Sequence, residues 1–176
     1  MEALERMAYC PACGSARFAV AGPKSRRCAG CGYEWFANPA AAVAAFITNS
    51  RGELLVERRK MDPASGTLDL PGGFADAGET AERAVAREVE EETGLAVSAS
   101  RYLFSLPNRY EYCGTVLPTL DMFFACSVEE GAEPVAADDA AECLWVPMGG
   151  IDPAAFGLAS IRRGVELYLS MRPGKP

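Results

Sequence analysis

The sequence predicts an α/β protein in which a mixed sheet packs between helices, with a small cysteine-rich unit in front of it. Strand-like segments precede and follow one strongly helical segment, and a second helical segment closes the chain. Four cysteines in two close pairs fall within the first 36 residues and mark the separate unit. We therefore expect two domains, residues 1–36 and residues 37–176.

Length and composition are those of one ordinary domain with a small appendage, since the chain has 176 residues and is 49% hydrophobic. No apolar run is long enough to span a bilayer, and the first residues lack the pattern of a signal peptide. We therefore expect a cytoplasmic protein without a membrane partner. The net charge of −7 argues against broad affinity for nucleic acid, although residues 1–36 carry five basic and only three acidic side chains.

The first unit holds two C-x2-C pairs separated by 14 residues, Cys10 with Cys13 and Cys28 with Cys31. This spacing is typical of a zinc ribbon, in which four thiolates close a tetrahedral site. Two disulfides are disfavoured in the cytoplasm, and a redox role for each pair is disfavoured by the ribbon spacing. A closed site has no open position for a substrate, so we expect structural Zn²⁺. The remaining cysteines are predicted to be small buried residues: Cys113, Cys126 and Cys143.

The segments after the cysteine pairs read as alternating strands and turns. A closing strand is expected near Tyr33–Phe36, and Asn49–Gly52 is expected to turn the next two strands into a hairpin. The further strands are predicted at Ala41–Thr48, Glu53–Arg58, Tyr102–Ser105, Leu120–Val128 and Glu142–Val146, and Thr67–Leu70 is expected to lead into the Gly-rich turn. An amphipathic helix is predicted at Ile161–Met171.

The central segment Gly73–Leu95 carries glutamates at a spacing that a helix would focus. Glu88, Glu91 and Glu92 lie at i, i+3 and i+4, on one side of the helix. The same stripe begins with apolar residues, which are Ala81, Ala84, Val85 and Val89. Carboxylates gathered at the edge of a core repel one another unless a divalent cation neutralises them. A solvated acidic helix is the alternative, and we expect Mg²⁺ or Mn²⁺ instead.

The segment resembles the Nudix box, G-x5-E-x7-R-E-U-x-E-E-x-G-U with U aliphatic. The nine matching positions are Gly73, Glu79, Arg87, Glu88, Val89, Glu91, Glu92, Gly94 and Leu95. Membership of the Nudix hydrolases implies an α/β/α sandwich with a mixed sheet and a metal-dependent enzyme. The ribbon followed by this box is similar in order to bacterial NADH pyrophosphatases. The implied reaction is hydrolysis of the pyrophosphate bond in a nucleoside diphosphate linked to another moiety.

The resemblance also implies roles for individual residues. Glu88, Glu91 and Glu92 would hold Mg²⁺ or Mn²⁺, together with a backbone carbonyl at Gly72 or Gly73. Arg87 would orient Glu91, or else form an ordinary i,i+4 surface pair. Because the chain has no histidine, the general base must be a carboxylate or a hydroxide on the metal. The candidate carboxylates are Glu91 and then, on a later loop, Asp138, Asp139 and Glu142.

The segment after the box bears on substrate choice. NADH pyrophosphatases carry the motif SQPWPFPxS after the box, and this chain reads SLPNRYEY at Ser105–Tyr112, without the Trp and Phe. Arg109 could contact a phosphate and Tyr110 or Tyr112 could stack on a base, while sheet packing is the alternative for these aromatics. NADH and ADP-ribose are the expected kinds of substrate. RNA cap or NAD-cap removal and a noncatalytic ligand-sensing module stay open, as does a homodimer.

Overall fold

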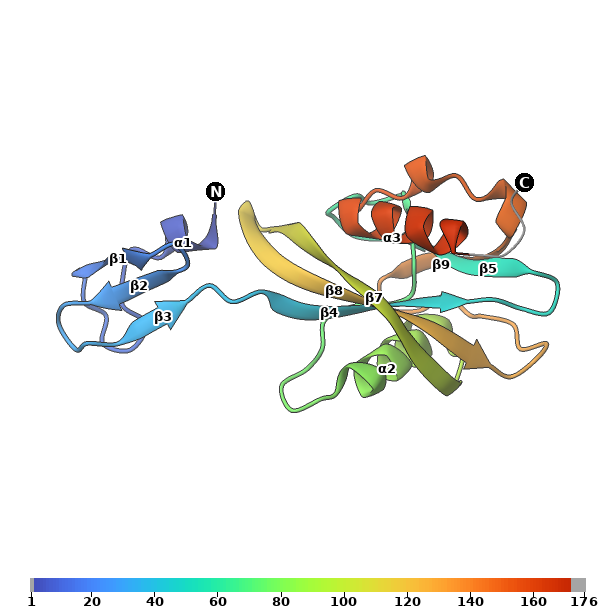
Figure 1. The fold of residues 1–176 in the computed structure, drawn as a ribbon, viewed down its shortest axis with the longest axis horizontal. Helices are drawn as coiled ribbons and strands as arrows, with labels where there is room; N and C mark the ends of the chain where they lie inside the picture. Colours follow the sequence, from blue (N-terminus) through green and yellow to red (C-terminus); the bar gives the residue numbers. More distant parts are fainter. Residues whose placement is uncertain (1, 172–176) are drawn as a thin grey trace. The chain divides into compact units, whose positions relative to one another are not determined.

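A computed structural model describes residues 2–171 and divides the chain into two units (Figure 1). The first unit comprises the chain up to Ala40 together with Arg109–Thr119, and the second comprises Ala41–Asn108 with the chain from Leu120 onward. The outer ends of the two expected domains, residue 1 and residues 172–176, lie outside the described residues. The division at residue 36 stays a prediction, to which the structure adds that Arg109–Thr119 group with the cysteine-rich segment.

The first unit is built on a three-stranded sheet in the order β1-β2-β3. Both pairs of neighbouring strands are antiparallel. Its elements are helix α1 (Ala3–Arg6) and strands β1 (Phe18–Gly22), β2 (Ser25–Cys28) and β3 (Glu34–Phe36). Its small core consists of Cys10, Phe18 and Cys28 with Met7 and Trp35 against them. Two of these core residues are cysteines, so the fold of this unit depends on the state of its thiols.

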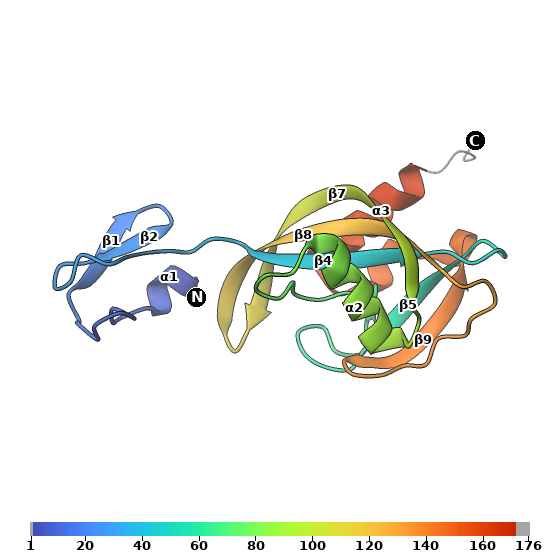
Figure 2. The same cartoon turned by 90° about the horizontal axis from the view of Figure 1, so that it is seen from below.

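The second unit contains two three-stranded sheets, of orders β4-β8-β7 and β6-β5-β9, except that the adjoining ends of β7 and β8, within Arg109–Thr119, group with the first unit. Helices α2 (Ala81–Thr93) and α3 (Ala159–Ser170) lie on opposite sides of the strands (Figures 1 and 2). The strands are β4 (Ala40–Ile47), β5 (Glu53–Arg59), β6 (Leu68–Asp69), β7 (Val97–Tyr112), β8 (Thr115–Val128) and β9 (Ala140–Pro147). Two short 3-10 turns, η1 (Met148–Gly150) and η2 (Pro153–Ala155), precede α3. The predicted mixed α/β sandwich is confirmed.

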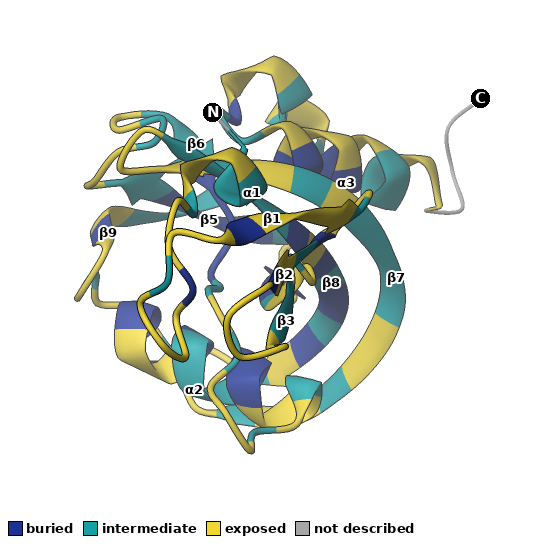
Figure 3. Ribbon diagram, turned by 90° about the vertical axis from the view of Figure 1, so that its left-hand side faces the viewer, coloured by how far each residue is buried: buried dark blue, intermediate teal, exposed yellow. Residues whose placement is uncertain are grey.

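Alternate residues of the strands fill two separate cores, because successive side chains of a strand point to opposite faces. The core on the α2 side takes the odd-numbered residues of β4 and includes Val43, Ala45, Ile47, Leu55, Val85 and Val89. The core on the α3 side takes the even-numbered residues and includes Ala44, Phe46, Leu54, Val56, Ile161 and Val165. Buried segments, dark blue in Figure 3, lie along β8 and on both helices.

The expected hairpin of the first two strands of the second unit is wrong. β4 and β5 follow one another through the turn at Asn49–Gly52, but they belong to different sheets and share an isolated bridge between Thr48 and Leu54. β4 instead pairs with β8, and β5 pairs along its length with β9. Both strands carry apolar residues on both faces, and a local turn signal does not reveal which partner covers them.

The structure instead has a hairpin that the sequence analysis missed, between β7 and β8. Cys113 and Gly114 form the two-residue connection with φ angles of 48° and 68°. Positive φ at both positions is the geometry of a type I′ turn, which asparagine and glycine commonly supply. Cys113 is therefore exposed, against the prediction that it is buried. Cys126 is buried as predicted, and burial raises the pKa of its thiol to about 11. Cys143 is partly buried.

Among the helices of residues 2–171, none combines the length and the apolar composition needed to cross a bilayer.

Gly164 of α3 tests the tight packing of this helix against the sheet. A Cβ at this position would lie 2.7 Å from Cζ of Phe123, whose ring packs in one cluster with those of Phe46 and Phe104. We expect Gly164→Ala to lower the free energy of unfolding by about 1–3 kcal/mol because the stacked rings cannot move apart freely.

Urea denaturation followed by circular dichroism measures this change. Gly149→Ala is the matched control, because a Cβ there meets nothing within 4 Å. Its effect should stay within about 0.5 kcal/mol. Equal stability of the two variants would contradict the packing argument.

Candidate active site and metal centres

Helix α2 has defined ends that place its acidic residues beside the sheets. Thr80 caps the first turn, where its Oγ1 accepts a hydrogen bond from the N–H of Arg83 at 3.3 Å. Gly94 ends the helix in the left-handed region with φ 69°, and its N–H donates to the Glu90 carbonyl at 2.9 Å. The glutamates therefore occupy the last two turns.

The loop before α2 runs against β4 through backbone hydrogen bonds. The N–H of Ala45 donates to the Pro71 carbonyl and the N–H of Val43 donates to the Gly73 carbonyl, both at 2.8 Å. A Cβ at Gly72 would overlap the Val43 carbonyl oxygen. Only glycine therefore lets the loop approach β4 this closely.

Glu92 joins the loop to the helix from inside the protein. Its side chain is only 7% exposed, and Oε2 accepts a hydrogen bond from the Gly72 N–H at 2.8 Å. Burial, followed by the neighbouring Glu57, raises the pKa of Glu92 to about 10. A carboxyl group in these surroundings strongly favours either a proton or a cation.

Glu88 lies against the loop one turn earlier. A Cβ at Gly73 would come within 2.7 Å of the Glu88 carboxylate, so glycine is needed at this close approach. Burial raises the pKa of Glu88, and the guanidinium of Arg87 opposes this rise. Two partly desolvated carboxylates beside a glycine loop form an oxygen donor set of the kind that Mg²⁺ and Mn²⁺ prefer. The residues present therefore fit a divalent cation.

Arg87 connects the loop and the helix through several acceptors. Its guanidinium donates to Glu79 at 2.9 and 3.1 Å, to Glu88 at 2.8 Å and to Glu91 at 2.9 Å. It also donates to the Phe74 carbonyl at 3.0 Å. These hydrogen bonds, that of Glu79 first, raise the pKa of Arg87. Arg87 thus makes more contacts than an i,i+4 surface pair would.

The three glutamates expected to bind the metal, Glu88, Glu91 and Glu92, differ in burial and in contacts. The Glu91 side chain is 48% exposed and contacts Arg87, whereas Glu88 and Glu92 are largely buried. Within residues 2–171, the geometric criterion for a cluster of three or more close metal-ligand atoms is met by the four cysteines. Arg87 donates to both Glu88 and Glu91, and the Gly72 N–H donates to Glu92, so each carboxylate accepts a hydrogen bond.

The later acidic candidates lie at the start of β9. Asp138 and Asp139 are exposed, and their backbone carbonyls accept hydrogen bonds from Lys60 at 3.1 and 3.0 Å. Glu142 forms an ion pair with Arg58 at 3.2 Å and is its register partner. Because neighbouring strand residues point to opposite faces, this pair lies on the face away from the α2 side.

The predicted substrate-contacting residues fall at the far end of β7, in the first unit. Arg109 forms an ion pair with Glu2, Tyr110 is partly buried and Tyr112 is 59% exposed. The box helix belongs to the second unit. The structure therefore groups these residues apart from the box.

Sequence analysis missed two buried carboxyl groups on the strands beside α2. Glu57 of β5 is 3% exposed, and its register partner Asp69 on β6 is 7% exposed. Asp69 forms an ion pair with Arg59, whereas burial and then Asp69 raise the pKa of Glu57 to about 8. The signal was present in the segment ELLVER. Glu57 lies two residues after Leu55 and therefore on the same face of the strand.

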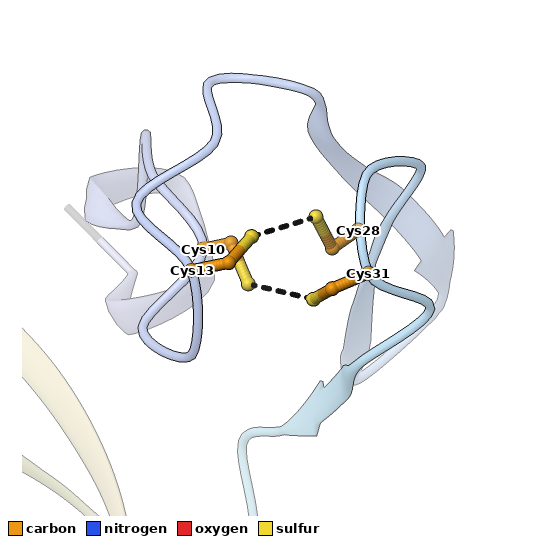
Figure 4. Close-up of side chains that lie close together, drawn as sticks. All are labelled: Cys10, Cys13, Cys28 and Cys31. Carbon is orange, nitrogen blue, oxygen red and sulfur yellow. Dashed lines mark hydrogen bonds between the residues drawn. The ribbon is translucent and has the colours of Figure 1, made fainter.

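The four cysteines of the first unit converge from two loops, as Figure 4 shows. Cys10 Sγ lies 3.7 Å from Cys31 Sγ, and Cys13 Sγ lies 3.6 Å from Cys28 Sγ. Backbone N–H groups, that of Cys31 first, lower the pKa of Cys28 to about 6. All four sulfurs lie within 4.8 Å of one another and can surround a metal ion.

Comparison with known proteins agrees with this geometry. An ADP-ribose pyrophosphatase of Methanocaldococcus jannaschii is 37% identical over 126 residues, which cover 70% of this chain and 71% of that protein. The NAD-capped RNA hydrolase NudC of Stutzerimonas stutzeri is 28% identical over 169 residues, which cover 96% of this chain and 58% of that protein.

Solved structures and family matching give the same assignment. A NUDIX hydrolase of Nitrosomonas europaea has the same fold, with a TM-score of 0.73 at 20% identity over 97% of this chain and 95% of the other. Residues 38–165 match the NUDIX domain. The loop, the helix and its glutamates lie inside this range, and the chain belongs to the NUDIX domain family.

Proposed function

We propose that the second unit hydrolyses the pyrophosphate bond of a nucleoside diphosphate linked to another moiety, with the help of Mg²⁺ or Mn²⁺. One observation carries the proposal. A glycine loop and the C-terminal half of α2 hold two desolvated carboxylates, with Glu92 bonded to the Gly72 N–H at 2.8 Å and Glu88 against Gly73. An acidic, desolvated pair beside a glycine loop suits a cation that in turn binds phosphate.

Glu88, Glu91, Glu92 and the Gly72 carbonyl are the proposed ligands of the cation. The Gly73 carbonyl already accepts a hydrogen bond from Val43, which favours Gly72 for this role. When bound, the cation would supply neutralisation of the phosphate oxygens and a lowered pKa for an attacking water. Arg87 fixes the side chains of Glu88 and Glu91 through its hydrogen bonds.

Glu91 is the proposed general base. Its carboxylate is nearly half exposed, so it can meet a water molecule, and Arg87 fixes its orientation at 2.9 Å. Proton removal by a positioned carboxylate makes water a stronger nucleophile toward phosphorus. Glu142 is less suitable because Arg58 holds it on the other face of the strands. Asp138 and Asp139 remain the alternatives on the later loop.

Zn²⁺ is the proposed occupant of the four-cysteine site. Zn–S bonds of about 2.3 Å place the sulfurs of a tetrahedron about 3.8 Å apart. The pairs at 3.6 and 3.7 Å are close to this value and well beyond a disulfide bond. A reducing compartment such as the cytoplasm would keep these thiols available. The closed ligand set favours a structural role.

The substrate class is proposed from the relatives. One relative is named for ADP-ribose, which supports a free dinucleotide or nucleotide sugar. The alternative is NAD-cap removal from RNA, which is favoured by similarity to an NAD-capped RNA hydrolase along 96% of this chain, the cysteine unit included. A sensing module without activity is the third possibility. A homodimer remains an expectation from the family resemblance.

A substrate panel tests these alternatives directly. The full chain with Mg²⁺ would be incubated with ADP-ribose, NADH and a short NAD-capped RNA, and the products separated by chromatography. Release of AMP from a small substrate supports the proposal, and preferred cleavage of the capped RNA supports the alternative. Binding without any product in the presence of Mg²⁺ or Mn²⁺ would establish a sensor.

The first prediction from this site concerns the box glutamates. We expect Glu91→Gln and Glu92→Gln each to lower kcat by about 10²-fold or more, because each loses the charge and keeps the shape of the side chain. Steady-state kinetics on the best substrate measures this loss, and circular dichroism checks the fold.

Glu90→Gln is the matched control, since Glu90 is exposed and neighbours Glu91. Its turnover should stay close to that of the wild type. Near-normal turnover of both box variants would remove the basis of the assignment.

A second prediction concerns the cysteine site. Cys10→Ser should release zinc and loosen the first unit, because metal binding supplies folding energy in such sites. The wild type should contain one zinc per chain by elemental analysis after purification without chelator. Cys113→Ser is the control, since this exposed cysteine lies outside the cluster. Absence of zinc from the wild type would contradict the assignment.

A third prediction concerns the tyrosines of β7. If Tyr112 stacks on a base, Tyr112→Ala should weaken substrate binding by about 1–3 kcal/mol. The loss should appear mainly in KM, because a contact remote from phosphorus acts equally on ground and transition states. Tyr9→Ala, which removes another exposed tyrosine of the first unit, is the control. An unchanged KM for Tyr112→Ala and Tyr110→Ala places the pocket elsewhere.

A further inference from the structure

Glu57 carries a buried oxygen without a partner. Its side chain is 3% exposed, and Oε1 makes no hydrogen bond. Arg26 Nε, in the first unit, is the other such side-chain atom among residues 2–171. A buried carboxylate oxygen loses the hydration that it has in water, so a native structure normally supplies it with a donor or a cation.

The positions around Glu57 do not supply this donor. Its register partners are Asp69 on β6 and Cys143 on β9, one an acid and the other a thiol. Arg59, the cation two residues along the strand, donates to the Asp69 carboxylate and to the Pro63 carbonyl at 2.8 Å. The nearest positive side chain thus serves a different acid.

Glu57 faces the box helix. Leu55, two residues earlier on the same face of β5, packs with Val85 and Val89 of α2. Glu88 and Glu92 of α2 both act on the pKa of Glu57, and Glu57 in turn raises the pKa of Glu92. Acidic groups from a strand and from a helix therefore meet where the glycine loop passes.

We propose that Glu57 is a further ligand of the divalent cation held by Glu88 and Glu92, with its unpartnered Oε1 turned to the cation. This inference deepens the proposed function and rests on it. A cation at this place satisfies the orphan oxygen and neutralises the three acids that repel one another. It also ties β5 to α2, so the rigid sheet fixes the position of the ion. Hard oxygen ligands suit Mg²⁺ and Mn²⁺.

Mn²⁺ titration followed by electron paramagnetic resonance tests the proposal. The zinc-loaded full chain would be compared with Glu57→Gln, which keeps the shape and removes the charge, and with Glu92→Gln. We expect Glu57→Gln to weaken Mn²⁺ binding by at least about 10-fold, the lower end for residues that support a metal site. A Kd equal to that of the wild type would overturn the proposal.

Glu53→Gln is the matched control. Glu53 lies on the same strand and the same face, but it is held by Arg51 at 2.8 Å. Its removal should leave Mn²⁺ affinity unchanged. An equal loss in both variants would show a nonspecific effect of charge and would overturn the specific role of Glu57.

Thermal unfolding separates a ligand from a merely structural residue. In the metal-free protein near pH 7, Glu57→Gln should raise Tm, because burial raises the pKa of Glu57 and folding therefore disfavours its charged form. Mn²⁺ should raise the Tm of the wild type more than that of the variant. A ligand stabilises the folded state more when it binds more tightly, and the variant should bind Mn²⁺ more weakly. If Glu57→Gln changes the Tm of the metal-free protein but Mn²⁺ raises the Tm of variant and wild type equally, Glu57 is a structural residue. That result would overturn the proposal.

Glu57→Asp covers the case in which Glu57→Gln does not fold. It keeps the charge on a shorter side chain, so Mn²⁺ binding should be weaker than in the wild type and the fold retained. Wild-type affinity in Glu57→Asp would contradict the inference. A different outcome would contradict the proposed function itself: the wild type would bind no Mn²⁺, and Glu92→Gln would have no effect on Mn²⁺ binding. If Glu92→Gln loses affinity while Glu57→Gln does not, only the Glu57 assignment falls.

Discussion

The hydrogen bond from the Gly72 N–H to Glu92 is the interaction on which the site depends. It joins the glycine loop, which runs along β4, to the last turn of α2. Loss of this contact would leave a buried carboxylate with no backbone donor and would free the loop from the helix. The position of Glu88 against Gly73 and the reach of Arg87 to the Phe74 carbonyl both follow from this junction.

Side chains of a strand alternate between two faces and so fill two cores. The same alternation also places a charged side chain in the core on the α2 side. Leu55 packs with α2, and Glu57 follows it on the same face. Arg59 of β5 is already paired with Asp69, and Arg87 of α2 is already paired with Glu79, Glu88 and Glu91. The buried carboxyls therefore outnumber their positive partners, which is the condition under which a divalent cation binds well.

Two kinds of metal-ligating side chain are separated within one chain. The first unit gathers thiol sulfurs, which are soft ligands, from loops that bury little else. The second unit gathers carboxylate oxygens at the edge of a large apolar core. A small domain cannot bury enough apolar surface to fold alone, so a metal can stabilise it, whereas the larger unit can hold a metal for chemistry.

The sequence by itself determined the family, the acidic stripe of α2 and the thiol cluster, because these depend on local spacing: glutamates at i, i+3 and i+4 share one side of a helix, and two C-x2-C pairs bring four sulfurs together. The tertiary structure decided the rest. Pairing of β4 with β8 rather than β5, the turn at Cys113, and the approach of Glu57 to Glu92 all join residues distant in the chain. Such contacts depend on which surfaces bury one another. The two-residue period of a strand shows which side chains share a face, but it does not show which strand or helix packs against that face.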